Sequence, residues 1–387
     1  MAGGRALLVA GVALTTLACA NALHAPSAAL RGPATVPQQQ GMGSAGSLLK
    51  RTSVAQPAMQ LRGGEGAAWY SSFWNETVEL GVLFGLWYWG NVYYNIYNKK
   101  ALNLLGGAKG GMVWTIACSQ LLVGVCWVVP LWLLGIRKAP QMTTDNWKQI
   151  APVGLFSAGA HGGSVIALGA GAVSFGQILK ACEPAFSAVN EAVFLGQVQA
   201  WQVYMTLIPI IGGVALASLK ELSFSWLAVI SAMLANESAA LKAVVGKTVM
   251  KESWAKALGA ANQYGVVNIW SVVFTLPLVL ALELPKLQES YNKALRTGAK
   301  ENDIMMNVFL SGFAFYLYNE VSFMALAKVS PITHSVANTL KRVVIIVVSC
   351  IVFKTEMTAE SKIGSAVAIA GTLLYSLAKQ KYGAAAH

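Results

Sequence analysis

Apolar runs of about twenty residues recur along this chain from Val78 onward, separated by short polar or Gly/Pro breaks. About 20 apolar residues in a helix cross the roughly 30 Å of hydrocarbon in a bilayer. Each run is about twice as long as a membrane-spanning strand and lacks its alternation, so helices are the spanning form. Of the 387 residues, 56% are hydrophobic and 11% are charged, whereas a soluble domain has about 25% charged residues. The pattern predicts an all-α polytopic membrane protein and excludes a disordered chain, a coiled coil and most soluble enzymes.

The apolar runs predict ten spans in two halves. They lie near residues 76–97, 112–136, 149–168, 172–197, 200–219, 222–245, 258–282, 304–327, 331–354 and 360–380. The break at Lys220–Glu221 leaves five spans on each side, and an odd number per half makes the second half enter the membrane from the opposite face. We therefore expect two inverted five-helix repeats, over 76–219 and 222–380, followed by a tail over 381–387. Faintly similar stretches precede the fourth and ninth spans, namely Ala167–Leu168…Val173–Ser174 and Ala325–Leu326…Val329–Ser330.

The first sixty-four residues have the composition of a targeting leader. Arg5 is followed by a short apolar run and by small residues around Ala20–Asn21–Ala22, which predicts a signal peptide over 1–22. Residues 23–64 contain Ser, Thr, Pro, Gln and basic residues, and no acidic residue precedes Glu65, as in a transit peptide. Such a two-part leader resembles that of proteins sent to complex plastids in algae with secondary endosymbionts. The alternative is a plain secretory leader followed by a disordered linker.

The formal net charge is +12, but the cations are scattered between apolar runs, so nucleic acid is not an expected partner. Most cations lie at span edges, as in Asn98–Lys99–Lys100, Arg137–Lys138 and Lys379–Gln380–Lys381. Side chains there reach the membrane surface, and their charge needs no further explanation.

Three cations lie well inside spans: Lys180 in the fourth, and Lys341 and Arg342 in the ninth. A charge near the bilayer centre costs at least about 2.5–3.5 kcal/mol, so these side chains should face a cavity or a partner. Ser330, His334, Asn338 and Lys341 share one helical face. Three cations at similar depth favour a site for a doubly charged anion, because Arg offers a planar fork to phosphate oxygens and Lys a point charge.

Internal ion pairs are the alternative explanation for these cations. Glu183 could pair with Lys242, and Glu320 with another cation, as ion pairs in the lumen or at a gate. Charge counting leaves the choice open, and His334 fits either a lumen lining or helix packing. No His/Cys metal spacing, HExxH, GxSxG or phosphate-binding loop occurs in the sequence, so we expect neither a cofactor nor a metal, and no enzyme.

Ordered motifs along residues 86–382 resemble the plastidic phosphate translocators of the drug/metabolite transporter superfamily. They are Asn95–Ile–Tyr–Asn98–Lys99–Lys100, Val173–Ser–Phe…Lys180–Ala–Cys–Glu183–Pro184, Ala217–Ser218…Glu221–Leu–Ser–Phe–Ser–Trp226, Tyr316–Leu–Tyr318–Asn319, Ser330–Pro–Ile–Thr–His334–Ser–Val–Ala–Asn338–Thr–Leu–Lys341–Arg342, and Gly371–Thr–Leu–Leu–Tyr375–Ser376. The resemblance implies ten helices and exchange of phosphorylated C3, C5 or C6 compounds for inorganic phosphate.

The resemblance also implies roles for individual residues. It places phosphate on Lys180, Lys341 and Arg342 and the carbon end of the substrate on His161, Ser164 and Tyr318. His161 with Ser164 is similar to the triose-phosphate type, whereas three other stretches look more like glucose-6-phosphate members, namely Glu183–Pro–Ala–Phe186, Val321–Ser–Phe–Met324 and Asn338–Thr–Leu340. The chain departs from the family pattern at three places, with Gly176–Gln177 where the family has Thr-His, Glu320 where it has Gln, and Lys242 where it has Arg.

The expected function is therefore an antiporter in a plastid envelope membrane. It would exchange inorganic phosphate for phosphorylated C3 compounds (triose phosphate, 3-phosphoglycerate) by alternating access. The alternatives are a hexose-phosphate, pentose-phosphate or phosphoenolpyruvate translocator of the same family, or a nucleotide-sugar transporter of the endomembrane system. The sequence predicts no oligomeric state.

Overall fold

A computed structural model describes residues 76–383, except for the side chains of Glu76, Thr77, Pro331 and Ile332. The expected signal peptide (1–22), the transit-like leader (23–64) and residues 384–387 of the expected tail lie outside this part.

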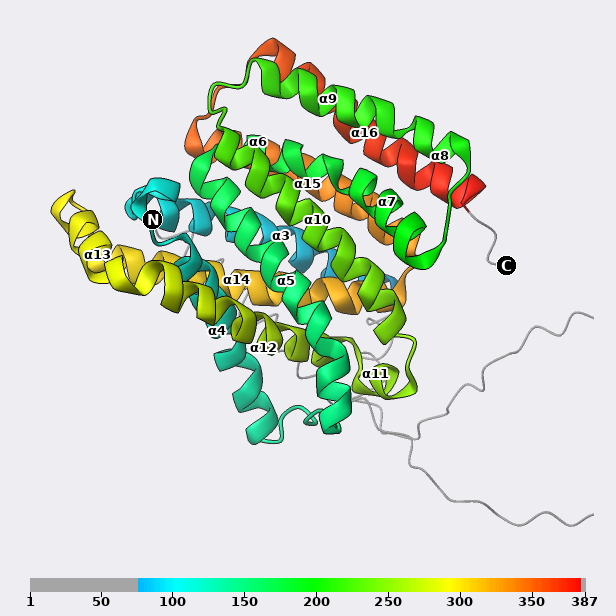
Figure 1. The fold of residues 1–387 in the computed structure, drawn as a ribbon, viewed down its shortest axis with the longest axis horizontal. Coiled ribbons are helices and arrows are strands. Elements are labelled where there is room, and N and C mark those ends of the chain that lie inside the picture. The colour runs from blue at the N-terminus through cyan, green and yellow to red at the C-terminus, as the bar shows by residue number, and fades with distance from the viewer. Residues whose placement is uncertain (1–75, 384–387) are drawn as a thin grey trace, which may run out of the picture. The chain divides into compact units, whose positions relative to one another are not determined.

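The secondary structure of residues 76–383 is helical throughout (Figure 1). The α-helices are α3 (Glu76–Leu104), α4 (Val113–Leu133), α5 (Thr144–Ala170), α6 (Val173–Leu179), α7 (Glu183–Leu195), α8 (Trp201–Met205), α9 (Leu207–Leu219), α10 (Trp226–Val249), α11 (Ser253–Leu258), α12 (Ala260–Leu278), α13 (Leu287–Arg296), α14 (Glu301–Lys328), α15 (Pro331–Phe353) and α16 (Ala359–Tyr382). Short 3₁₀ segments cover Gly107–Gly110, Lys180–Cys182 and Leu284–Lys286, and a π-helical turn covers Val279–Glu283.

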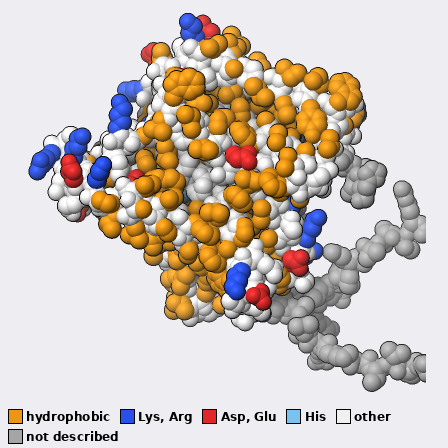
Figure 2. All heavy atoms as spheres, in the orientation of Figure 1, with side chains coloured by type: hydrophobic (Ala, Val, Ile, Leu, Met, Phe, Trp, Pro, Cys, Tyr) orange, Lys and Arg blue, Asp and Glu red, His pale blue; other side chains and the backbone are white. Residues whose placement is uncertain are grey.

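Seven helical segments in the described part are long and apolar enough to cross a membrane. They are Val113–Leu133, Thr144–Ala170, Trp201–Leu219, Trp226–Val249, Ala260–Arg296, Thr333–Phe353 and Ala359–Tyr382. Hydrophobic side chains cover most of the visible surface, and Lys and Arg lie mainly at its margins (Figure 2). Exposed large apolar residues such as Leu133, Leu234 and Ile351 are what a lipid-facing surface requires. The chain is therefore a polytopic helical membrane protein.

Small residues let the helices approach closely. A Cβ on Gly213 of α9 would lie 2.5 Å from the backbone nitrogen of Ala368 on α16, and a Cβ on Gly364 would lie 2.6 Å from the carbonyl oxygen of Gly213. Gly163 of α5 similarly faces the backbone of Ser231 on α10. These contacts pair α9 with α16 and α5 with α10 in the way that small residues pair membrane helices.

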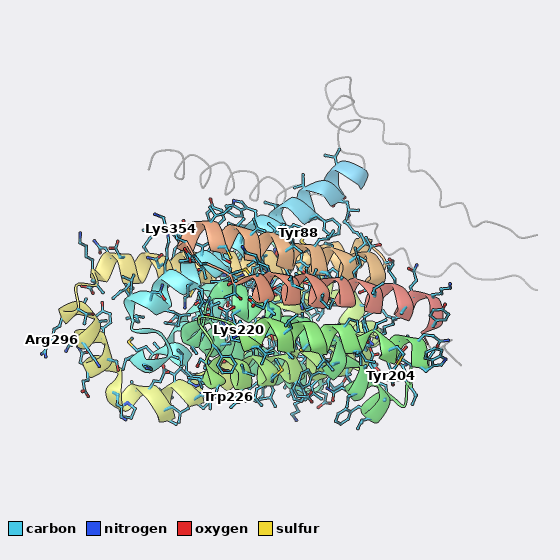
Figure 3. The ribbon with its side chains drawn as sticks, turned by 90° about the horizontal axis from the view of Figure 1, so that it is seen from above. Tyr88, Tyr204, Lys220, Trp226, Arg296 and Lys354 are labelled. Carbon is cyan, nitrogen blue, oxygen red and sulfur yellow. The ribbon has the colours of Figure 1, made fainter. Side chains whose placement is uncertain are left out.

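The helices run between two ends of the bundle. Arg296, the last residue of α13, and Lys354, directly after α15, lie toward one end, and Tyr204 of α8 lies toward the other (Figure 3). The C-terminal ends of α3 and α5 lie at the first end, called here the α13 end, because Leu287, Tyr291 and Leu295 of α13 pack against Leu102, Leu105 and Leu168.

Candidate functional site

A cavity of about 290 Å³ lies among α3, α5, α6, α10, α14 and α15. Its lining brings together nine of the ten site residues predicted from the sequence, namely His161, Ser164, Lys180, Glu183, Lys242, Tyr318, His334, Lys341 and Arg342. The expected polar face of α15 is present through His334, Asn338 and Lys341. Ser330 does not line the cavity, and its hydroxyl instead accepts a hydrogen bond from the Thr333 backbone at the start of α15.

A break in the helix creates the anchor for Arg342. Pro184 has no N–H, so it cannot donate to the Lys180 carbonyl as a helical residue would. The helix tightens into the 3₁₀ segment Lys180–Cys182, and two side chains from other helices bind the backbone oxygens at the break. Asn236 Nδ2 of α10 donates to the Leu179 carbonyl at 2.9 Å, and Arg342 Nη1 donates to the Lys180 carbonyl. The break thus fixes Arg342 at the wall of the cavity.

Arg342 also forms the one ion pair among the residues that line the cavity. Its Nη2 lies 2.8 Å from Glu183 Oε2. Lys242 was one expected partner of Glu183, and the structure assigns the contact to Arg342 instead. The Arg342 residue is only 6% exposed, and its guanidinium retains further N–H donors beyond these two contacts.

Lys341 is held by aromatic rings. Its Nζ lies 4.9 Å from the ring centroid of Trp87 on α3 and 5.7 Å from that of Tyr318 on α14. Such contacts stabilise an ammonium without neutralising it. His334 stacks on the same Trp87 ring at 4.6 Å, and its Nε2 lies 3.1 Å from Ser322 Oγ, so His334 both lines the cavity and packs against α3.

The cavity has an excess of positive charge. Four cations and one carboxylate line it, and among the described residues Lys180, Lys242 and Lys341 form no ion pair within 4.0 Å. The other intramembrane carboxylates are used elsewhere: Glu191 pairs with Lys247 and Lys379, and Glu237 accepts a hydrogen bond from Asn190. Internal ion pairing therefore accounts for Arg342 alone, and three cations face a shared space.

The predicted carbon-end residues lie in an aromatic wall. His161 is buried, and its ring centroid lies 4.0 Å from that of Phe315 and 6.3 Å from that of Tyr94. Tyr94 and Tyr318 lie 5.6 Å apart, centroid to centroid. Ser164 Oγ donates to the Ala160 carbonyl at 2.6 Å, which leaves its lone pairs available as acceptors.

Glu320 lies outside the cavity lining. Its carboxylate contacts both terminal nitrogens of Arg137, at 2.5 and 3.2 Å, and both side chains are buried. Arg137 follows α4 in the α4–α5 loop, at the end of a span as expected, but its charge is used in a buried ion pair. Glu320 does pair with a cation, as the ion-pair alternative expected, and that cation is Arg137 of the α4–α5 loop.

Residues of α3 form one wall of the cavity that was not predicted from the sequence. Trp87, Asn91, Tyr94 and Asn95 line the cavity. They recur at helical spacing on one face of α3. Two asparagines on one face of an apolar helix are a signal that could have identified this wall.

Residues 78–376 match the Triose-phosphate Transporter family. The chain is 38% identical over 308 residues to "Phosphoenolpyruvate/phosphate translocator 3, chloroplastic" of Oryza sativa subsp. japonica, covering 79% of this chain and 76% of that protein. It is 36% identical over 305 residues to "Triose phosphate/phosphate translocator, non-green plastid, chloroplastic" of Brassica oleracea var. botrytis, covering 79% and 74%. It is 35% identical over 305 residues to "Glucose-6-phosphate/phosphate translocator 1, chloroplastic" of Arabidopsis thaliana, covering 79% and 76%. These relatives are translocators and not enzymes, and the chain belongs to the triose-phosphate transporter family.

Proposed function

We propose that this protein is a secondary antiporter that exchanges inorganic phosphate for phosphorylated C3 compounds, triose phosphate and 3-phosphoglycerate, across a plastid envelope membrane. The observation that carries the proposal is the cavity in which Lys180, Lys242 and Lys341 lack a carboxylate partner. Unpaired charges inside a membrane protein mark the path of a charged solute. Relatives named for phosphate exchange support the same solute class.

In this proposal the phosphate group binds Lys180, Lys341 and Arg342. Arg342 supplies directed N–H donors, while the two lysines supply mobile point charges. The carbon end lies against His161, Ser164 and Tyr318, which line the same cavity. The short hydroxyl side chain of Ser164 and the tyrosine hydroxyl suit the oxygen-rich C3 compounds.

The proposed architecture has ten spans in two inverted repeats. Its spans are α3, α4, α5, α6–α7, α8–α9, α10, α12, α14, α15 and α16. Helix packing supports it. The repeat relation replaces each span by the span five positions along, so α3 corresponds to α10 and α14 to α5. The packed pair α3–α14 therefore corresponds to the packed pair α10–α5. The same shift maps the packed pairs α4–α12, α6–α15 and α9–α16 onto themselves, as a two-fold relation between the halves requires.

Alternating access would use a barrier at the α13 end. Lys99 Nζ donates to the carbonyls of Leu168 and Gly171, at 2.8 Å each. Leu168 lines the central cavity, whereas Gly171 and Lys99 line a separate surface hollow. Lys99 thus ties α3 to the α5–α6 turn between the two spaces. Opening toward the hollow requires that this contact breaks while the two halves rock around the solute.

In this proposal the carrier must bind a solute for each crossing, because the cavity carries an excess of positive charge. Closing an empty cavity would desolvate like charges, which is unfavourable. A doubly charged phosphate offsets most of that charge, so the loaded carrier crosses and the empty one does not. A leader over 1–22 and 23–64 would direct the protein to a complex plastid.

Proteoliposomes containing the purified protein test the proposal. Phosphate uptake should require internal phosphate or triose phosphate, and equal uptake without either would contradict exchange. Lys341→Gln should abolish exchange, whereas Lys148→Gln, at an exposed position on α5, should not. The alternatives within the family predict preference for a hexose phosphate, a pentose phosphate or phosphoenolpyruvate, and a nucleotide-sugar transporter predicts that UDP- or GDP-sugars compete with phosphate.

A further inference from the structure

Gly176 leaves free space along one wall of the cavity. It lies four residues before Lys180, so both face the same side of the helix, about 6 Å apart along its axis. Gly176 lines the cavity, and within 4 Å a Cβ built on it would meet only Leu168 Cδ1, at 3.9 Å. Leu168 is itself a lining residue. A side chain at position 176 would therefore project into the cavity rather than into packed protein.

Neither packing nor backbone conformation explains a glycine here. A Cβ on Gly154 or Gly163 would lie within 3 Å of a neighbouring helix, so close helix contact explains those two glycines. Gly176 has no such neighbour, and it lies inside α6 with ordinary helical geometry. Glycine in a helix interior destabilises the helix by roughly 0.5–1 kcal/mol relative to alanine. What Gly176 contributes in this structure is open space at the wall of the cavity.

Two amide side chains border this space. Asn95 and Gln177 line the cavity, are more than nine-tenths buried, and are joined by a hydrogen bond of 3.2 Å from Gln177 Nε2 to Asn95 Oδ1. Asn95 Nδ2 is used by the oxygens of Asn91. No described residue donates to the Gln177 amide oxygen, which is therefore an acceptor available to a hydroxyl group.

We propose that Gly176, Asn95 and Gln177 form a floor subsite that receives the hydroxyl-bearing carbon chain of pentose and hexose phosphates. On α5, His161, Ser164 and Leu168 occupy one helical face at successive turns, so the floor lies one turn beyond the position proposed for the end of a C3 compound. A longer ester continues past Ser164 into this floor, where amides can bind its hydroxyls. The inference rests on the proposed phosphate exchange and widens its substrate class beyond C3 compounds.

Space is limiting in this cavity. Its volume of about 290 Å³ is at the lower limit of sites that hold small organic ligands, roughly 300 Å³. The three heavy atoms of a threonine side chain at position 176 would take up a substantial part of the floor. The same change should leave the phosphate end, formed by Lys341 and Arg342 on α15, unaltered.

Counter-exchange in proteoliposomes tests the floor subsite. The wild-type protein, Gly176→Ala and Gly176→Thr are each assayed for phosphate–phosphate exchange and for exchange of phosphate with dihydroxyacetone phosphate, xylulose 5-phosphate and glucose 6-phosphate. Overpacking of about 1–3 kcal/mol predicts that Gly176→Thr lowers exchange of the two longer esters roughly five- to 150-fold. Phosphate and C3 exchange should stay within about threefold, and Gly176→Ala should have a smaller effect of the same direction.

Two controls separate the possible failures. Gly212→Thr introduces the same side chain on α9 where nothing lies within 4 Å, and it should leave all four exchanges unchanged. Gln177→Leu keeps the side-chain size but removes the amide, and it should selectively lower exchange of the longer esters.

Wild-type protein that exchanges phosphate and C3 esters but neither longer ester would overturn the floor subsite alone. Equal losses of exchange for all substrates in Gly176→Thr would do the same. Absence of any phosphate exchange would overturn the proposed function as well.

Discussion

Arg342 Nη2 and Glu183 Oε2 lie 2.8 Å apart across the cavity wall, so one of the four cations in the lining is partly neutralised before any solute binds. Replacing Glu183 by Gln removes this compensation and leaves all four cations facing a bound phosphate. We expect Glu183→Gln to lower the KM for phosphate and to lower the maximal exchange rate, because a dianion held by more charge is released more slowly.

Phosphate–phosphate exchange measured against external phosphate concentration gives both quantities. Glu289→Gln on the exposed α13 helix is the matched control and should change neither. A higher KM in Glu183→Gln would mean that Glu183 acts by orienting Arg342 rather than by setting the charge of the cavity.

The contact between Lys341 and Trp87 predicts a role for an aromatic residue in binding an anion. The ammonium lies 4.9 Å from the ring centroid, and a cation–π contact contributes about 0.5–2 kcal/mol. Trp87→Leu should therefore raise the KM for phosphate roughly two- to thirtyfold, and Trp87→Phe, which keeps a π face, should raise it less. The measurement is the concentration dependence of phosphate exchange, with Trp89→Leu on the same helix as control. Equal effects of Leu and Phe at position 87 would show that the ring acts through packing alone.

The pair formed by Arg137 and Glu320 predicts a loss of stability without a change in substrate affinity. Breaking a buried ion pair by removing one partner costs about 3–5 kcal/mol, so Arg137→Gln and Glu320→Gln should each lower the unfolding temperature in detergent. Replacing both partners by apolar residues, Arg137→Met with Glu320→Leu, should recover much of the loss. Because Glu320 does not line the cavity, the KM for phosphate should stay within about twofold in every variant that reconstitutes. A large KM change in Glu320→Gln would place the carboxylate in contact with the solute path.

The site cations were predictable because a charge within an apolar run is visible in the sequence and needs a physical reason. Lys180, Lys341 and Arg342 were identified in this way, and the structure places them in one cavity. Helix lengths were less predictable. The first span was expected over 76–97, yet α3 continues to Leu104, because hydropathy marks the hydrocarbon layer while the backbone hydrogen bonds of a helix extend beyond it.

The partners of the charges were not predictable from the sequence. Glu183 meets Arg342 because of the helix break before Pro184. The Lys180 carbonyl, which also accepts from the Glu183 backbone N–H, reaches Arg342 through the packing of α6 on α15. Glu320 meets Arg137, which lies 183 positions away in a loop. The packing of α14 against α4 brings the two residues together, and no local sequence pattern encodes that contact.

The two hydrogen bonds of Lys99 predict how strictly the export of phosphate depends on the import of a second solute. Its ammonium donates to the Leu168 and Gly171 carbonyls at 2.8 Å each, and hydrogen bonds from a charged group contribute about 1.5–3 kcal/mol. Lys99→Met removes both bonds while keeping an unbranched side chain, so the barrier at the α13 end should open more often in the absence of solute. We expect phosphate efflux into a phosphate-free medium to rise roughly tenfold relative to phosphate–phosphate exchange. Lys100→Met, at the neighbouring position whose ammonium lies near the Tyr97 ring, should leave that ratio unchanged. If Lys99→Met also leaves it unchanged, the contact stabilises α3 but does not govern access. If both exchange and efflux are lost while the protein stays folded, the contact is required for transport rather than for closure.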